Sequence, residues 1–257
     1  MFFKSKYRIL KHMHFLADQQ GILQRYMKEA TGWAAHIKHT KQEIINGATG
    51  KGNNKCAILG SGWLLDIPME ELTARFNELH LIDIIHPTQI KNKYKNNNKI
   101  KCIECDVTGG AINEFFDSVQ FHKSTGKRIE PDEFKFKGFV NSEGYDYIAS
   151  VNILNQLDIL LIDYIKNYNI YNESELLLLR KKIQQSHIDS LPKGKSCLVT
   201  DYEEQIFGSG VQPESIRSLI HVVLPENQLI NQWDWQFDHQ TYYPGKNVVF
   251  KVAAYQL

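Results

Sequence analysis

The sequence predicts an α/β fold in which a mainly parallel, doubly wound sheet carries helices on both faces. From Lys55 onward, short apolar runs alternate with amphipathic helical segments. The first run, 56–59, leads into a turn that contains Gly60 and Gly62. The last two runs lie within 230–255 and are separated by a hairpin-sized loop, which predicts an antiparallel strand at the end of the chain.

The composition is typical of a globular protein without a general affinity for nucleic acid. The chain has 257 residues, of which 42% are hydrophobic and 23% charged, so it can bury a large core and is not expected to be disordered. Its net charge of +1 argues against a generally basic surface for nucleic acid. No apolar run approaches the roughly 20 residues that span a bilayer, and the first residues do not resemble a signal peptide. We therefore expect a cytoplasmic protein with no membrane partner.

The four cysteines are expected to be reduced thiols. Cys56, Cys102, Cys105 and Cys197 all fall in predicted strands. Cys102 and Cys105 have CxxC spacing, but an odd separation on a strand sends the two side chains to opposite faces. The sequence has no second CxxC. We therefore predict no metal site, and strand cysteines of this kind fit a reducing cytoplasm.

Residues 1–50 are predicted to form an N-terminal helical cap on a main domain that covers 51–257. Apolar residues recur at helical spacing from Leu23 to Ile44, and a shorter helix is expected over 7–17. The cap contains four histidines without acidic or cysteine partners nearby, and we interpret them as a solvated face: His12, His14, His36 and His39.

The main domain reads as seven strands and the helices between them. We expect strands over 55–60, 79–84, 101–107, 145–151, 196–200, 230–237 and 246–255, and helices over 68–77, 87–95, 111–121, 157–165, 173–190 and 213–221. The stretch 120–144 mixes basic and aromatic residues, a pattern that also occurs on nucleic-acid surfaces. We interpret it as an insertion that packs its own phenylalanines.

The turn after the first strand resembles a nucleotide-binding unit. Glycine lets the backbone turn sharply and lets a ligand approach closely. Asp66 is a candidate helix cap, and Pro68 is suited to the first helical turn. Asp83 ends the second predicted strand about 20 residues after the glycines, at the distance expected for a carboxylate that binds ribose hydroxyls.

These motifs together resemble the class I S-adenosylmethionine (SAM)-dependent methyltransferases over residues 55–257. The resemblance covers the glycine turn, the acids that end strands two and three, the segment after strand four, the turn before strand five and the terminal hairpin: Leu59-Gly-Ser-Gly62, Asp83, Asp106, Ser150–Leu157, Leu191-Pro-Lys-Gly194 and 230–255. It implies a Rossmann-like, seven-stranded sheet in the order 3-2-1-4-5-7-6 with strand seven antiparallel. It also implies SAM as the cofactor.

The first motif departs from the family pattern. The family usually has an acid two residues before the first glycine, where this chain has Ile58. The third small residue of the pattern is Leu64. This atypical motif one leaves Asp66 to take part of the role of the missing acid.

The resemblance assigns the site residue by residue. It implies cofactor binding by residues at the carboxyl ends of strands one to four: Gly60, Ser61, Gly62, Asp83, Ile84, Asp106, Val107 and Asn152. Side chains expected at strand ends next to the methyl group are the candidates for catalysis: Asn152, Asp201 and Tyr202, followed by Glu203 and His239. Asn152 has an alternative role as a cap of the following helix.

Other nucleotide sites fit the glycine turn less well. A dinucleotide site needs a third glycine where this chain has Leu65, and bulky residues from Trp63 onward separate the turn from the helix that would bind a pyrophosphate. The P-loop pattern G-x-x-x-x-G-K-[ST] is absent from the sequence. SAM has no phosphate, so these residues obstruct it less.

The sequence predicts a small molecule or a protein side chain as methyl acceptor, in preference to nucleic acid. Adenine methylation usually accompanies an N/D-P-P-aromatic motif, and the segment Asn152-Ile-Leu-Asn155 differs from it. The N-terminal cap and the insertion 120–144 are the expected sources of acceptor selectivity. The alternative is a catalytically inactive binding or scaffold protein with the same fold. An open cavity between Gly60, Asp83 and Asp106 would favour the enzyme.

Overall fold

The computed structural model describes residues 2–139 and 144–257 and contains one central sheet. Its path runs β3-β2-β1-β4-β5-β8-β7, and β6 pairs with β5 off this path. The strands are β1 (Lys55–Leu59), β2 (Glu78–Asp83), β3 (Ile100–Glu104), β4 (Tyr147–Val151), β5 (Ser196–Phe207), β6 (Ser215–Ser218), β7 (Leu229–His239) and β8 (Asn247–Gln256). The helices are α1 (Phe2–His12), α2 (Phe15–Ala48), α3 (Met69–Arg75), α4 (Thr88–Tyr94), α5 (Ala111–Thr125), α6 (Ile159–Lys166) and α7 (Glu173–Asp189), with a 3-10 turn, η1 (Glu226–Gln228).

The strand order confirms the predicted topology. Strands β1 to β5 are parallel, and β8 is antiparallel to both of its neighbours, β5 and β7. The predicted strands six and seven are β7 and β8, so the expected order 3-2-1-4-5-7-6 is the observed path. Mixed α/β architecture with this order is that of a Rossmann-like methyltransferase fold.

The region after β5 differs from the prediction. A helix was expected over 213–221, but Ser215–Ser218 forms the short strand β6. Strand β5 also continues to Phe207, well beyond residue 200. A bulge between Asp201 and Glu203 shifts its register with β8, and past this bulge β5 pairs with β6. A bulge bends a strand, which allows β5 to extend beyond the parallel part of the sheet.

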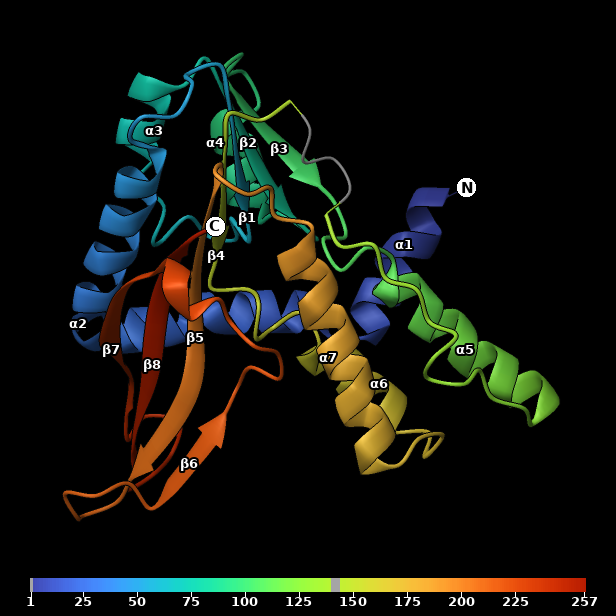
Figure 1. Cartoon of the computed structure of the whole chain (residues 1–257). Coiled ribbons are helices and arrows are strands. Elements are labelled where there is room, and N and C mark those ends of the chain that lie inside the picture. The colour runs from blue at the N-terminus through green and yellow to red at the C-terminus, as the bar shows by residue number, and fades with distance from the viewer. Residues whose placement is uncertain (1, 140–143) are drawn as a thin grey trace.

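Both faces of the sheet are buried, as alternating side chains require. Cys56 and Ile58 of β1 belong to a core shared with α2 and α3, whereas Ala57 and Leu59 belong to a core on the opposite face. Figure 1 shows α3 and the later part of α2 on one side of the sheet and α5, α6 and α7 on the other, while the earlier part of α2 runs across toward α1. The sheet is therefore doubly wound, as predicted.

The N-terminal segment forms two helices that meet earlier than expected. Helix α1 ends at His12, and α2 begins at Phe15 after His14, which adopts a left-handed conformation with φ 66°. Helix α2 is kinked at Glu29, where φ is −109° and ψ is 16°. Figure 1 shows the two parts of α2 running in different directions.

The interpretation of the four histidines as a solvated face is wrong for one of them. His36 is only 2% exposed, and its ring stacks on Trp235 of β7. His12, His14 and His39 are exposed. His36 is buried because α2 packs directly against β7.

The insertion packs its aromatic residues as predicted. Phe134 is buried, and both Phe134 and Phe136 contact Phe115 of α5. The rest of the predicted insertion includes residues 140–143, which lie outside the described residues.

All four cysteines are free thiols, although Cys105 lies just beyond the end of β3. No group of three or more metal-ligating side chains occurs among residues 2–139 and 144–257. Within the same described ranges, no helix combines the length and the apolar character needed to cross a membrane.

Candidate functional site

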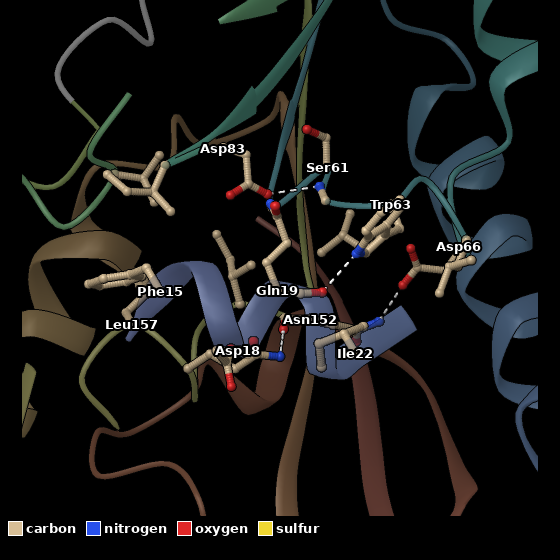
Figure 2. Close-up of a pocket in the computed structure, with 18 of the residues that line it drawn as sticks. Phe15, Asp18, Gln19, Ile22, Ser61, Trp63, Asp66, Asp83, Asn152 and Leu157 are labelled. Atoms are coloured by element: carbon tan, nitrogen blue, oxygen red, sulfur yellow. Dashed lines mark hydrogen bonds between the residues drawn. The ribbon is translucent and has the colours of Figure 1, made fainter. Parts of the chain in front are cut away.

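A cavity of about 200 Å³ lies at the carboxyl ends of β1, β2 and β4. Ligands of open α/β sheets bind at this edge, where the strand order reverses. Helix α2 and strand β7 complete the wall of the cavity with residues such as Gln19, His36 and Trp235. Figure 2 shows α2 crossing the cavity, with Asp18 and Gln19 on the helix.

The glycine turn after β1 forms one side of the cavity. Gly60 has φ 81°, and a Cβ atom there would lie 2.1 Å from Ile153 and 2.8 Å from the carbonyl oxygen of Val151. The backbone N–H groups of Gly60 and Ser61 both donate to the carbonyl oxygen of Ile82, at 2.9 Å and 3.3 Å. Glycine is therefore required at position 60 by both its backbone conformation and its neighbours.

Asp83 lies at the end of β2 and faces the turn. Its Oδ2 accepts a hydrogen bond from the backbone N–H of Gly62 at 2.8 Å (Figure 2). Burial raises the pKa of Asp83 to about 6, in spite of this hydrogen bond. The carboxylate is thus held in place by the turn, at the edge of the cavity where a ligand hydroxyl would need an acceptor.

Asp106 follows β3 and offers one unpartnered oxygen. Its Oδ1 accepts hydrogen bonds from the backbone N–H of Thr108 at 2.9 Å and from the Thr108 hydroxyl at 2.5 Å. Its buried Oδ2 has no hydrogen-bond partner in the part of the chain that the structure describes. Burial also raises the pKa of Asp106. The site therefore contains a buried acceptor suited to an N–H donor, with Val107 beside it on the cavity wall.

Asn152 follows β4 in a left-handed conformation, with φ 51°. Its side-chain amide contacts Asp66 Oδ2 at 2.7 Å and His36 Nε2 at 3.1 Å (Figure 2 shows the first contact). The next helix, α6, begins only at Ile159, so Asn152 does not cap it. Asp66 does not cap α3 either, because Pro68 occupies that position.

The structure brings together all the residues assigned to the cofactor. Each of them lines this one cavity: Gly60, Ser61, Gly62, Asp83, Ile84, Asp106, Val107 and Asn152. Residues of α2 and β7 on the cavity wall, such as Gln19 and Trp235, are among those that the sequence did not indicate. These residues recur at the spacing of ordinary core positions in a helix or a strand, so their spacing does not mark them as site residues.

The structure does not place the other catalytic candidates on the cavity. Asp201 is 2% exposed and accepts a hydrogen bond from Asn155, and Tyr202 contacts Gln232 of β7. Both lie in the interior of β5 because this strand continues to Phe207, so they are not at a strand end. Glu203 shares this position within β5, and His239 binds Glu29 of α2 at 3.0 Å.

Helix α2 is fixed over the cavity by two hydrogen bonds of Gln19. The Gln19 side chain donates to the carbonyl oxygen of Ile85 at 2.5 Å. The Trp63 indole N–H donates to the Gln19 carbonyl oxygen at 2.7 Å (Figure 2). These contacts tie the helix to the segment that follows β2 and to the glycine turn.

The charge on the cavity wall is entirely acidic. The wall includes Asp18, Asp66, Asp83 and Asp106, and none of the described residues that line it is lysine or arginine. A pyrophosphate in this cavity would have no cationic partner. The lining therefore disfavours a dinucleotide and suits a ligand with hydroxyl, amine and cationic groups.

No protein-family model and no curated protein matches the chain. Among solved structures, one similar chain is 1,6-didemethyltoxoflavin-N1-methyltransferase of Burkholderia thailandensis with bound 1,6-didemethyltoxoflavin and S-adenosylhomocysteine (9% identity, 96% of this chain and 90% of that chain, TM-score 0.41). A second comes from Thermobifida fusca and is described as a methyltransferase (10% identity, 91% and 82% coverage, TM-score 0.38). A third is a SAM-dependent methyltransferase of Leishmania major (11% identity, 89% and 82% coverage, TM-score 0.33). At these TM-scores, the assignment of the fold rests on the strand order of the chain itself.

Proposed function

We propose that this chain is a SAM-dependent methyltransferase whose acceptor is a small molecule or a protein side chain. The observation that carries the proposal is the meeting of the glycine turn, Asp83 and the unpartnered Oδ2 of Asp106 on one cavity. The hydroxyls of a ribose and the exocyclic amine of an adenine are hydrogen-bond donors, and the two carboxylates are acceptors. The residues present therefore fit the nucleoside half of SAM.

When bound, SAM supplies a methyl group on an activated sulfonium. The protein's own residues then hold the nucleoside, exclude water and align the acceptor, and positioning of this kind accounts for a large share of rate enhancement. Asp83 and Asp106 would fix the ribose and the adenine. Gln19 and Trp63 would keep α2 closed over the site. Asn152 is the side chain proposed to lie beside the methyl group.

One feature supports an enzyme in preference to an inactive scaffold, and two others bear on the acceptor. The cavity between Gly60, Asp83 and Asp106 is open and not filled by side chains. The cavity is also partly covered by α2, which suits a small acceptor and restricts a folded nucleic acid. The acidic wall further disfavours an acceptor with phosphate groups.

The proposal is tested by isothermal titration calorimetry with SAM and S-adenosylhomocysteine (SAH), with NAD as a comparison. We expect SAM and SAH to bind and NAD to give no heat. The Asp83→Ala variant should abolish SAM and SAH binding while circular dichroism shows an intact fold. Asp117→Ala, a change at an exposed acid on α5, is the matched control and should bind as the wild type does. Unchanged affinity in Asp83→Ala would overturn the assignment of the ribose site.

A further inference from the structure

A chain of polar side chains lies behind Asn152 and links β7, α2 and the end of β4. The Trp233 indole N–H donates to His36 Nδ1 at 3.1 Å. His36 Nε2 lies 3.1 Å from the Asn152 amide, which in turn lies 2.7 Å from Asp66 Oδ2. His36 is 2% exposed and Asn152 is 8% exposed, so water cannot readily replace these partners.

The Trp233 indole at one end fixes the direction in which hydrogen bonds are donated along this row of side chains. An indole N–H can only donate, so His36 Nδ1 must accept, and the proton of the neutral imidazole must be on Nε2. Burial lowers the pKa of His36 to about 3, which keeps the ring neutral. Nε2–H therefore needs an acceptor where it meets Asn152.

The acceptor on Asn152 has to be its amide oxygen. With the amide nitrogen toward His36, two N–H donors would face each other in a buried place, at a cost comparable to a lost hydrogen bond. A half-turn of the amide exchanges its nitrogen and oxygen without moving either position. The oxygen then accepts from His36 and also from Asp66, provided that Asp66 carries a proton. Burial raises the pKa of Asp66, which favours this neutral form.

The same half-turn places the Asn152 NH2 group where the structure has Oδ1, a buried position without a partner among the described residues. A second unpartnered donor belongs to another residue of the cavity wall: the Trp235 indole N–H is buried, with the residue 6% exposed, and has no partner within the described part of the chain. Trp235 stacks on the His36 ring with centroids 3.9 Å apart and planes 6° apart. Asn152 and Trp235 thus flank one imidazole, and both line the cavity (Figure 2 labels Asn152).

We propose that Asn152 and Trp235 form a two-donor subsite for a carboxylate or carbonyl oxygen of the bound ligand, and that Trp233 and His36 are positioning residues that set the direction of the Asn152 amide. This inference extends the proposed function. It depends on that function for one of the two sources of the ligand oxygen. The oxygen belongs either to the methionine carboxylate of SAM or to the methyl acceptor.

Indole N–H resonances can test the subsite directly in tryptophan-labelled, full-length protein. The sequence has four tryptophans, and the other three indoles donate internally: Trp33 to Phe237, Trp63 to Gln19 and Trp233 to His36. We expect SAH to shift the Trp235 N–H proton downfield and 5′-methylthioadenosine, which lacks the carboxylate, to leave it in place if SAM is the source. A shift that appears only when acetamide or acetate is added to the SAH-saturated protein assigns the subsite to the acceptor. A Trp235 resonance that none of these probes moves would overturn the subsite.

Affinity provides a second measurement of the same subsite. If SAM is the source, Trp235→Phe should weaken SAH roughly 10- to 100-fold, the range for one hydrogen bond to a charged carboxylate, and leave 5′-methylthioadenosine unchanged. If neither nucleoside binds the wild type, the proposed function fails. The acetamide and acetate titrations of the free protein still decide whether the two donors form a subsite.

The positioning role has its own readout in histidine-labelled protein. The His36 ring nitrogens should show the Nε2–H tautomer in the wild type, and Trp233→Phe should allow the other tautomer while the fold is kept. Lys38→Gln, an exposed change on the same helix, is the control and should leave the His36 pattern unchanged. An Nδ1–H tautomer in the wild type would overturn the direction of the chain.

Discussion

At the scale of single residues, the protonation of Asp83 should govern how the site binds its ligand. Burial raises the pKa of Asp83 to about 6, and the negative charge of Glu104 contributes in the same direction. A protonated carboxyl group accepts hydrogen bonds less well than a carboxylate. We therefore expect SAH affinity to fall as the pH drops through about 6, by up to roughly tenfold for each unit below the pKa. Calorimetry between pH 5 and pH 8 measures this dependence.

The control for this dependence is Asp83→Asn, which keeps the shape of the side chain and can still accept from Gly62. Its SAH affinity should be lower than that of the wild type by roughly 10- to 100-fold at neutral pH, since hydrogen bonds to charged groups contribute about 1.5–3 kcal/mol. The variant should show no change near pH 6. An equal decline in wild type and variant would assign the pH dependence to the ligand or to another group.

The sequence indicated some of these residues because of where they stand. Asp83 and Asp106 end or follow apolar strands, where an acid has no packing role, so the residue type itself was informative. His36 and Trp235 carried no such signal. His36 and its partner Trp233 in β7 are 197 positions apart in the sequence, so only folding brings them together. His36 also occupies a helical stripe that is indistinguishable from a core stripe.

At the scale of elements, α2 is expected to be part of the main core and to contribute strongly to stability. Trp33 is 3% exposed, stacks on Phe237 and donates its indole N–H to the Phe237 carbonyl oxygen at 2.9 Å. Trp33→Ala should lower the free energy of unfolding by about 3–5 kcal/mol, as for other large aromatic deletions in cores. Urea unfolding monitored by circular dichroism measures the change. Met27→Ala on the same helix, where Met27 is 73% exposed, should change it by less than about 0.5 kcal/mol.

The unfolding of Trp33→Ala also tests the predicted boundary at residue 50 between an N-terminal cap and the main domain. This boundary stays a prediction. A separate cap would lose its own structure in Trp33→Ala and leave the remaining sheet with a second, unchanged transition. A single core gives one cooperative transition shifted to lower urea. We expect the single transition, because Trp33 and Ile44 of α2 share one buried cluster with Ile58 of β1.

The error at β6 shows what local patterns miss at this scale. Ile216, Leu219 and Ile220 have helical spacing, which predicted a helix over 213–221. In the structure Ile216 is 59% exposed, and this segment pairs instead with residues 203–206 of β5. That pairing depends on the bulge in β5, which is a non-local feature. The pattern of apolar residues therefore could not separate a short edge strand from a helix.

At the scale of the whole molecule, the predicted strand order was correct because topology has few solutions. Parallel strands require crossover helices, these crossovers are right-handed, and a final hairpin can add only at an edge. Alternating strands and helices in the sequence therefore determined most of the sheet. The position of α2 was not determined in this way, because a helix that precedes the first strand has no crossover to constrain it.

Buried titratable groups should give the whole fold two opposing responses to acid. His187 of α7 is fully buried, holds Ser150 of β4 at 2.8 Å and has its pKa lowered by burial to about 4 from 6.5. The unfolded state therefore binds a proton first, and stability falls as the pH drops below about 6.5. Asp201 of β5 is also buried, and burial raises its pKa to about 7 from 3.8. Here the folded state binds the proton first, and stability rises as the pH drops through about 7.

Each group should change the free energy of unfolding by about 2 kcal/mol between pH 7 and pH 5, with opposite sign. His187→Gln should therefore make the protein gain stability on acidification relative to the wild type, and Asp201→Asn should make it lose stability. Urea unfolding at the two pH values measures both differences. The exposed, non-titrating change Met27→Ala should behave as the wild type does. Equal shifts in His187→Gln and Asp201→Asn would show that these two buried groups do not set the acid response, because opposite protonation preferences require opposite signs.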